Sequence, residues 1–219
     1  MKKFSAVIFD MDGVLIDSEP LWKESAYEVF KEYNLSIPKE QFATTTGLRV
    51  TEFVKYWFEE YKVDSRYCAK AEADIVLKII DKILANGKPL PGLEHIFNFF
   101  IQRNMKIGLA SSSPHSVIDV VVDYLGIRNH IDRISSAENL EYGKPHPQVY
   151  LNCARDMEVQ PSSCLCFEDS FNGLISAKAA RMACVIVPAH AEKNDPRWAA
   201  ADLKITSLMN FNELLMNTI

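Results

Sequence analysis

A short apolar run near the N-terminus, ending abruptly on two aspartates, constrains this chain more than any other feature. Residues 4–9 are apolar except for Ser5 and rich in aromatic and β-branched side chains, the composition of a buried strand. Asp10 and Asp12 follow at once, and Gly13 can take backbone angles that other residues resist. Two carboxylates this close repel each other unless a cation lies between them. The stretch therefore predicts either an ordinary Asp-Gly turn or a divalent-cation site at the end of a strand.

Beyond residue 92 the chain alternates between helical patterns and short apolar runs. Strands are expected over residues 105–110, 131–135, 164–167, 183–187 and 203–205. Strands separated by helices favour a parallel sheet whose right-handed crossovers cover both faces. We therefore predict an α/β fold with a doubly wound, parallel-sheet (Rossmann-like) core.

Residues 16–89 have a helical pattern instead. Apolar side chains recur at helical spacing over residues 20–33, 51–61 and 71–83. Residues 86–92, dense in glycine and proline, then form a linker. We therefore predict a core made of residues 1–15 and 90–219, with an inserted all-helical cap domain made of residues 16–89.

Polar residues follow three of the expected strands directly. They are Asp10 and Asp12, then Ser111, then Glu168 and Asp169. In open parallel sheets, ligands bind beyond the carboxyl ends of the strands, so these side chains should meet at one edge. Lys144 lies in a loop that can reach the same edge. This convergence favours a chemical site over an ordinary turn.

A phosphate monoester is the ligand that best suits these side chains. It is a dianion, and the four carboxylates alone would repel it. Mg²⁺ reverses the sign, because it takes a few carboxylates and accepts a phosphate oxygen; Asp10 and Asp169 are its natural ligands. Lys144 adds a positive charge, and Ser111 adds a hydroxyl. The Ser-Pro pair at 113–114 is typical of a helix start, which would either place a helix dipole beside the phosphate or serve capping alone.

Two aspartates suit covalent phosphoryl transfer because they can take unlike roles. One attacks phosphorus and forms an aspartyl-phosphate. The other donates a proton to the leaving oxygen and later takes one from the attacking water.

Four stretches, in this order, resemble the motifs of the haloacid dehalogenase-like superfamily. They are Phe9–Val14 (FDMDGV), Leu109–Ser113 (LASSS), Lys144–Pro147 (KPHP) and Glu168–Gly173 (EDSFNG). The match is closest to the members with a small helical cap, which include sugar-phosphate phosphatases and β-phosphoglucomutase. As an ordered set that spans most of the chain, the four motifs are highly specific.

The resemblance implies a role for each motif residue. Asp10 would be the nucleophile and, with Asp169, a carboxylate ligand of Mg²⁺. Asp12 would be the general acid/base, with its backbone carbonyl on the metal, and Glu168 would lie behind the metal or occasionally bind it. The phosphoryl group would be bound by Ser111, Ser112 and Lys144.

The activity that the resemblance implies is a Mg²⁺-dependent phosphatase of small metabolites, chiefly sugar or polyol phosphates. A phosphosugar mutase differs only in passing the phosphoryl group to a sugar hydroxyl, and mutase-like members carry a histidine where this chain has Trp22. A dehalogenase is disfavoured because Asp12 would have no leaving group to protonate. An inactive regulatory or binding module is the remaining alternative, and a dinucleotide binder lacks its glycine-rich fingerprint.

The predicted cap would supply the contacts that select the substrate. Gly47, Leu48 and Arg49 match the specificity loop of the family more loosely, and a plain connection between helices would give the same pattern. Glu19 and Trp22, at the start of the cap, are further candidates. Residues 194–198 (NDPRW) are similar to a segment of sugar-phosphate phosphatases, without an evident chemical role.

The composition of the chain argues against several classes of binding partner. The net charge is −5 and no stretch is basic, which disfavours nucleic acid and anionic membranes. The five scattered cysteines suggest reduced core packing, with zinc binding as the weaker alternative because Cys164 and Cys166 have no matching Cys or His pair nearby. No apolar stretch reaches about 18 residues. Lys2 and Lys3 precede an apolar run too short for a signal peptide. We expect a cytoplasmic monomer, or weak dimer, whose partner is a small-molecule phosphate ester.

Overall fold

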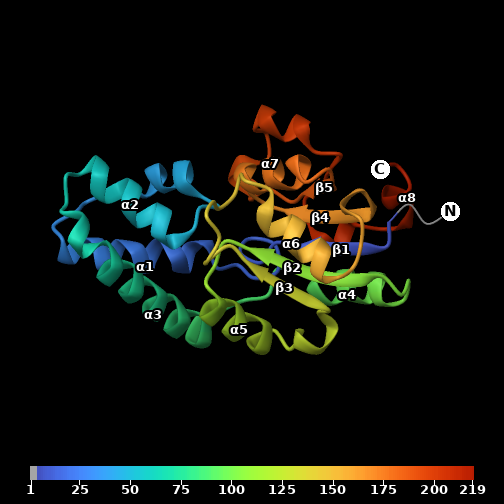
Figure 1. Ribbon diagram of the computed structural model, residues 1–219, viewed down its shortest axis with the longest axis horizontal. Helices are drawn as coiled ribbons and strands as arrows, with labels where there is room; N and C mark the ends of the chain where they lie inside the picture. The colour runs from blue at the N-terminus through green and yellow to red at the C-terminus, as the bar shows by residue number, and fades with distance from the viewer. Residues whose placement is uncertain (1–3) are drawn as a thin grey trace.

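The computed structural model describes residues 4–219, apart from the side chains of residues 39, 40 and 43, and contains a six-stranded parallel sheet (Figure 1). The strands, in sheet order, are β3 (Arg133–Ser136), β2 (Lys106–Ser111), β1 (Ala6–Phe9), β4 (Cys164–Glu168), β5 (Ala183–Ile186) and β6 (Leu203–Lys204). Each neighbouring pair runs parallel. The predicted doubly wound α/β fold is confirmed.

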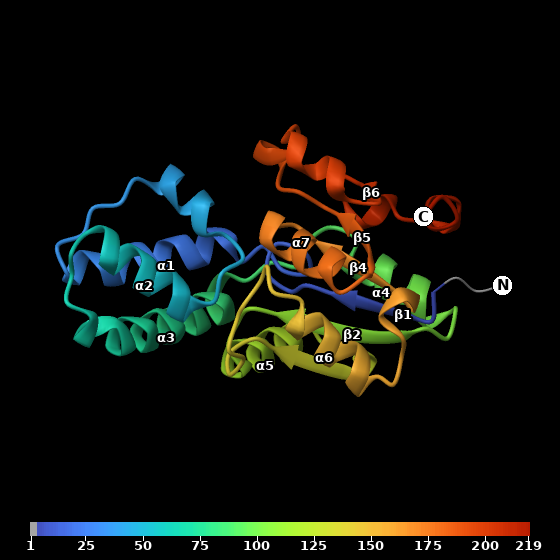
Figure 2. The same ribbon diagram turned by 45° about the horizontal axis from the view of Figure 1, so that its top comes forward.

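Helices cover both faces of this sheet (Figure 2). They are α4 (Leu93–Ile101) and α5 (His115–Tyr124) on one face, and α6 (Gln148–Asp156) and α7 (Phe171–Ala179) on the other. Because side chains alternate along a strand, Val7 and Phe9 of β1 pack with α4 and α5, while Ala6 and Ile8 pack with α6 and α7. β1 is therefore buried on both sides, as its nearly continuous apolar sequence predicts. The short helix α8 (Glu213–Met216) lies near the C-terminus.

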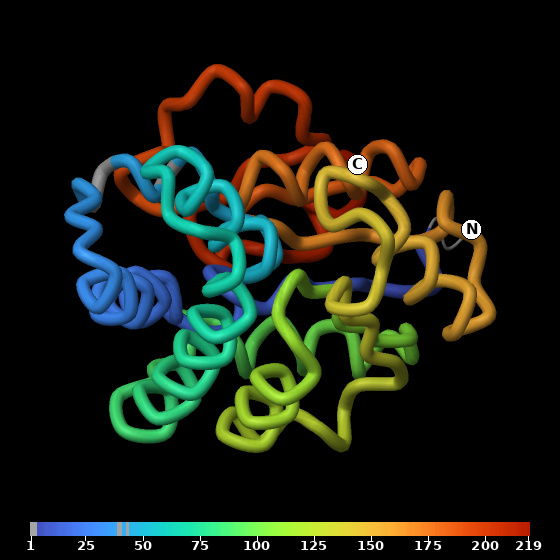
Figure 3. The backbone as a smooth tube through the Cα atoms, turned by 60° about the vertical axis from the view of Figure 1, so that its left-hand side comes forward, coloured from blue at the N-terminus to red at the C-terminus, as the bar shows by residue number. Residues whose placement is uncertain are grey.

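Three more helices form a separate layer at one end of the sheet, which we call the helical cap (Figures 1 and 3). They are α1 (Glu19–Glu32), α2 (Val50–Glu60) and α3 (Cys68–Asn86). These helices share an apolar cluster in which Phe30, Trp57 and Phe58 are almost fully buried. Helix α3 also packs along α5, and its Ile79 and Ile83 join the core cluster on that face of the sheet. Helix α3 thus anchors the cap to the core.

The chain crosses between core and cap twice, and the two crossings lie side by side. The backbone N–H of Asp17 donates to the Lys88 carbonyl at 2.9 Å, and that of Leu90 donates to the Leu15 carbonyl at 3.0 Å. The domain boundaries at residues 15/16 and 89/90 stay a prediction, and they fall within this paired crossing. The pairing places the start of α1 directly beyond the end of β1.

The carboxyl ends of the strands face the cap. Strands β2, β1 and β4 are neighbours in the sheet, so the residues that follow each of them emerge next to one another. This register brings together the segments that begin at Asp10, Ser111 and Glu168, which sequence reasoning placed at one edge.

No helix within residues 4–219 is long and apolar enough to cross a membrane. The five cysteines are all free thiols. Four of them are buried in the layer between the sheet and α6/α7: Cys153, Cys164, Cys166 and Cys184. Their surroundings agree with the predicted core packing.

Candidate active site

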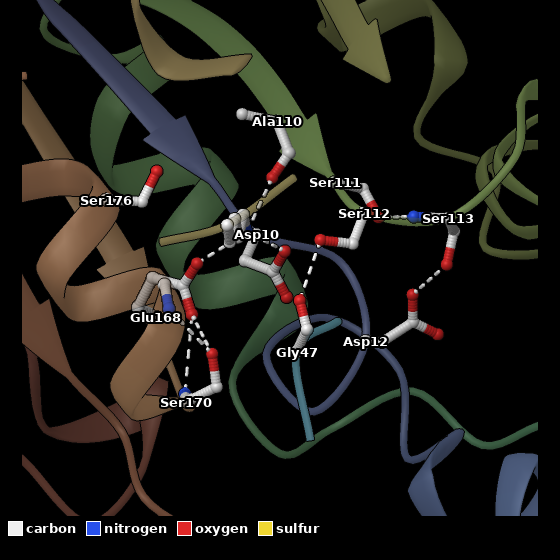
Figure 4. A network of polar contacts seen from close by, with 12 residues as sticks. Asp10, Asp12, Gly47, Ala110, Ser111, Ser112, Ser113, Glu168, Ser170 and Ser176 are labelled. Atoms are coloured by element: carbon white, nitrogen blue, oxygen red, sulfur yellow. Dashed lines mark hydrogen bonds and ion pairs between the residues drawn. The ribbon is translucent and has the colours of Figure 1, made fainter. Parts of the chain in front are cut away.

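Lys144 is the positive centre of a buried polar network at the end of the sheet. Its ammonium, in a side chain only 2% exposed, donates to Asp10 Oδ1 at 2.6 Å, Glu168 Oε1 at 2.5 Å and the Ala110 carbonyl at 3.1 Å. Figure 4 shows Asp10, Ala110 and Glu168 converging from three adjacent strands. Burial alone would lower the pKa of Lys144, but the two carboxylates raise it, so the ammonium stays charged.

Glu168 is fully buried, and the protein occupies both of its oxygens. Oε1 accepts from Lys144 and from the hydroxyl of Tyr150, the latter at 2.7 Å. Oε2 accepts from the backbone N–H groups of Asp169 and Ser170 and from the Ser170 hydroxyl. Glu168 therefore orients Lys144 and the loop after β4, and has little capacity left for a metal.

Asp10, Glu168 and Asp169 form the acidic cluster of this site, with one oxygen from each within 4.8 Å of the others. Burial raises the pKa of Asp10 to about 8; Lys144 opposes this shift, while Glu168 and Asp12 add to it. Burial also raises the pKa of Asp169 well above its usual range, and Asp10 and Glu168 add to it. A nucleophilic carboxylate must be ionised at neutral pH, so this cluster needs more positive charge than Lys144 supplies.

Gly13 shows how tightly the cluster is built. Its φ is +78°, and a Cβ on it would lie 2.0 Å from Asp169 Oδ2. The backbone after Asp12 therefore lies directly against the Asp169 carboxylate, which only glycine permits. The donor set and this close fit of backbone to carboxylate suit a small, oxygen-preferring cation such as Mg²⁺.

Asp12 has quite different surroundings from Asp10. Its Oδ1 accepts from the Ser18 hydroxyl at 2.5 Å and from the Trp22 indole N–H at 2.8 Å. Its Oδ2 accepts from the Ser113 hydroxyl at 2.7 Å (Figure 4). The carboxylate is thus bound between helix α1 of the cap and the loop after β2.

The predicted helix start at residues 113–114 is wrong. Helix α5 begins at His115, and Pro114, with an extended ψ of 152°, occupies the N-cap position. This geometry places Ser113 outside the helix, where its hydroxyl binds Asp12 instead of the first helical N–H groups.

Ser111 and Ser112, predicted to bind phosphate, both line the cavity above Asp10. The Ser111 hydroxyl accepts from the backbone N–H of Ser113 at 3.0 Å. The Ser112 hydroxyl donates to the Gly47 carbonyl at 2.8 Å, which ties the core to the loop of the cap (Figure 4). Their phosphate contacts stay a prediction.

The cavity lies between the helical cap and the edge of the core that holds Asp10 and Asp169. Apolar cap residues form much of its wall: Trp22, Ala26, Phe42, Leu48, Val50, Phe53 and Ile75. One ion pair, Glu19 with Lys23 at 3.0 Å, also lines it. Burial raises the pKa of Glu19, and Lys23 opposes that shift. The cap side of the wall therefore combines apolar surface with this ion pair and with Thr45 and Thr46.

The predicted cap residues separate into two groups. Glu19, Trp22, Gly47 and Leu48 line the cavity. Arg49 is outside the described lining: its guanidinium donates to the core carbonyls of Leu140 at 2.5 Å and Ala137 at 3.3 Å, and pairs with Glu52 at 2.6 Å. A substrate contact by Arg49 stays a prediction, and this geometry gives it no support.

Residues 194–198 pack beside the site. Trp198 is buried against Phe171, and Arg197 lies over the Phe171 ring at 4.8 Å. Together with Asn172, whose amide donates to the Thr46 carbonyl at 3.0 Å, they line a hollow against the cap loop. The segment therefore packs against the start of helix α7.

Sequence reasoning missed several residues of the site. The sequence pattern connects Ser113 with a helix start and does not single out Ser18, Lys23, Phe42 or Phe53 for the site. The available signal for the two serines was their position: Ser113 is the last residue of the second motif, and Ser18 lies four residues beyond the first motif. Phe42 and Phe53 carry no signal beyond apolar periodicity.

Comparison with known proteins gives consistent matches. Residues 7–187 match the family model described as haloacid dehalogenase-like hydrolase. The chain is 37% identical over 208 residues to hexitol phosphatase B of Escherichia coli (strain K12), covering 94% of each protein. It is 28% identical over 188 residues to fructose-1-phosphate phosphatase YqaB of the same organism, covering 85% of this chain and 97% of that one.

A solved structure shows the same fold. β-Phosphoglucomutase from Clostridium difficile superimposes with a TM-score of 0.88 over 98% of this chain and 96% of its own, at 23% sequence identity. At that identity the likeness concerns the architecture of core and cap alone.

Proposed function

The chain belongs to the haloacid dehalogenase-like hydrolase family and is a phosphatase, and we propose that it hydrolyses small sugar or polyol phosphates through an aspartyl-phosphate on Asp10. The observation that carries the proposal is the unlike surroundings of its two aspartates. Asp10 lies in an ionic cluster with Lys144 and Asp169, whereas Asp12 is held by two hydroxyls and an indole. These surroundings suit a nucleophile and a proton carrier, respectively.

We further propose that Mg²⁺ is the cofactor. Asp10, Asp169 and the backbone carbonyl of Asp12 would hold it, with Glu168 behind them. When bound, the cation would supply the positive charge that the acidic cluster lacks and that a phosphate dianion requires.

In the first step, a carboxylate oxygen of Asp10 forms a bond to phosphorus while the bond from phosphorus to the leaving oxygen breaks. The proton on Asp12 passes to that oxygen, and a neutral alcohol leaves. Lys144 and the groups at Ser111 and Ser112 would hold the remaining phosphoryl oxygens in place.

In the second step, water loses a proton to Asp12 and its oxygen bonds to phosphorus. The bond from phosphorus to Asp10 then breaks and releases inorganic phosphate. Both carboxyl groups return to their starting states.

The cap wall supports a polyhydroxylated leaving group. Glu19 can accept hydrogen bonds from hydroxyl groups and Lys23 can donate them, while Trp22 and Phe53 cover the carbon skeleton. Two relatives of the chain are named hexitol phosphatase and fructose-1-phosphate phosphatase, and these names concern substrates of this kind. The mutase alternative is not favoured, since its structural support lies in fold alone.

Phosphate release from a panel of sugar and polyol phosphates, with Mg²⁺ or with chelator, tests the proposal. Asp10→Asn should abolish release, and Asp123→Asn, which changes an exposed carboxylate paired with Arg128, should not. Asp12→Asn should accumulate phosphoenzyme from an aryl phosphate, whose leaving group needs no proton; intact-protein mass spectrometry detects it. Wild-type rates in Asp10→Asn would refute the mechanism, and an isomeric sugar phosphate without free phosphate would show a mutase.

A further inference from the structure

Trp22 lies where the core and the helical cap meet. Its ring packs against both the core cluster on the α4/α5 face and the separate apolar cluster of the cap. Its indole N–H donates to Asp12 Oδ1 at 2.8 Å, and the side chain also lines the cavity. One side chain therefore touches both the proposed proton carrier and the space for the leaving group.

The hydrogen bonds of Asp12 leave its two oxygens in different states. A carboxylate offers about four acceptor positions, two on each oxygen. Ser18 and Trp22 occupy both positions of Oδ1, at 2.5 and 2.8 Å. Ser113 occupies one position of Oδ2, at 2.7 Å. Among the described residues, nothing else donates to Asp12, so one position, on Oδ2, is left for a proton.

Trp22 keeps a proton off Oδ1 of Asp12, because an indole N–H can only donate a hydrogen bond. A hydroxyl such as that of Ser18 can rotate and accept, so it alone would not keep a proton off Oδ1. The packing of the ring against two clusters also fixes where its N–H points.

We infer that Trp22 is a positioning residue for Asp12, holding Oδ1 so that Oδ2 is the oxygen that exchanges protons with the leaving group and with water. This inference rests on the proposed phosphatase mechanism and adds to it a residue that acts through Asp12. The ring of Trp22, as part of the cavity wall, also places the leaving group relative to that oxygen.

Two substitutions separate the N–H from the ring. Trp22→Phe keeps an aromatic wall and removes the donor, so kcat should fall about tenfold, the usual cost of a hydrogen bond to a charged group, with KM unchanged. Trp22→Leu removes both, so KM should rise as well. Trp57→Phe is the matched control: it removes a buried indole N–H that bonds Thr45 Oγ1 instead of Asp12, and should leave kcat unchanged. A kcat for Trp22→Phe within twofold of wild type would overturn the inference.

An NMR measurement tests the contact without relying on activity. The three tryptophans donate to three different acceptors: the Asp12 carboxylate, Thr45 Oγ1 and the Glu192 carbonyl. In protein labelled with ¹⁵N-tryptophan, Asp12→Ala should move the Trp22 indole signal, assigned by its loss in Trp22→Phe, further than those of Trp57 and Trp198. An unmoved Trp22 signal would refute the inference alone, whereas a wild type that released no phosphate from any ester would refute the proposed function.

Discussion

Gly13 gives the sharpest test of the acidic cluster, because its backbone lies against Asp169. A Cβ at this position would lie 2.0 Å from Asp169 Oδ2 and 2.6 Å from its Cγ, whereas ordinary contacts begin at 3.4 Å. In Gly13→Ala the carboxylate would therefore have to shift by roughly 1 Å or more, and a displacement of that size can cost about 100-fold in rate. The new methyl group would move Asp169 out of the cluster with Asp10.

Backbone strain must be separated from this collision, since Gly13 has a positive φ of +78°. Gly126 offers the matched control: its φ is +68°, and a Cβ there would meet no heavy atom within 4 Å. Alanine at either site should lower the free energy of unfolding by about 1 kcal/mol through the left-handed backbone alone. Any effect specific to Gly13→Ala then comes from the displaced carboxylate.

We expect kcat/KM of Gly13→Ala to fall about 100-fold, with a higher Mg²⁺ concentration for half-maximal rate, while Gly126→Ala keeps wild-type values. Phosphate release across a Mg²⁺ titration measures both quantities, and urea unfolding measures the stability of each variant. Equal rates and equal Mg²⁺ requirements in the two variants would show that Asp169 is not needed where the structure places it.

Two further predictions concern the cap contact and the thiols. Arg49→Ala should lower the free energy of unfolding by about 1 to 3 kcal/mol, because it leaves the Leu140 carbonyl without its donor and removes the guanidinium from the Glu52 carboxylate; a raised KM at unchanged stability would instead indicate a substrate contact. Burial raises the pKa of the four buried thiols, which keeps them protonated at pH 8. A disulfide reagent should therefore react with at most Cys68 in the native protein, and with all five cysteines in urea. Two or more thiols reacting in the native state would contradict this packing.

The meeting of Asp10, Ser111 and Glu168 could be predicted from sequence because it depends only on topology. Each residue follows an apolar run, and parallel neighbours must release their loops on the same side. The number of residues between them did not matter, because a helical crossover of any length returns the chain to the same end of a parallel sheet. The ends of the strands therefore suffice to place these three residues together, whereas their expected roles come from the family resemblance.

The directions of side chains could not be predicted in the same way. Arg49 follows a glycine-containing loop, and nothing in its spacing indicates that its guanidinium reaches carbonyls about ninety residues away in sequence. Ser113 differs from a capping serine only through the extended backbone of Pro114. Such choices depend on distances of a few ångströms between segments that meet only in the folded chain.

The place where the cap is inserted explains why the two aspartates differ. A tight turn follows β1, in which the Gly13 N–H donates to the Ile16 carbonyl at 2.9 Å, and helix α1 then begins at Glu19. Asp12 therefore takes two of its three donors from the first residues after that turn, whereas Asp10 contacts Lys144 from the core. A different inserted helix would change the surroundings of Asp12 and the cap wall of the cavity together, and would leave the contacts of Asp10 with Lys144 untouched. In the mechanism we propose, substrate choice and proton transfer would thus be coupled through the first turns of α1, because Trp22 contacts both Asp12 and the cavity.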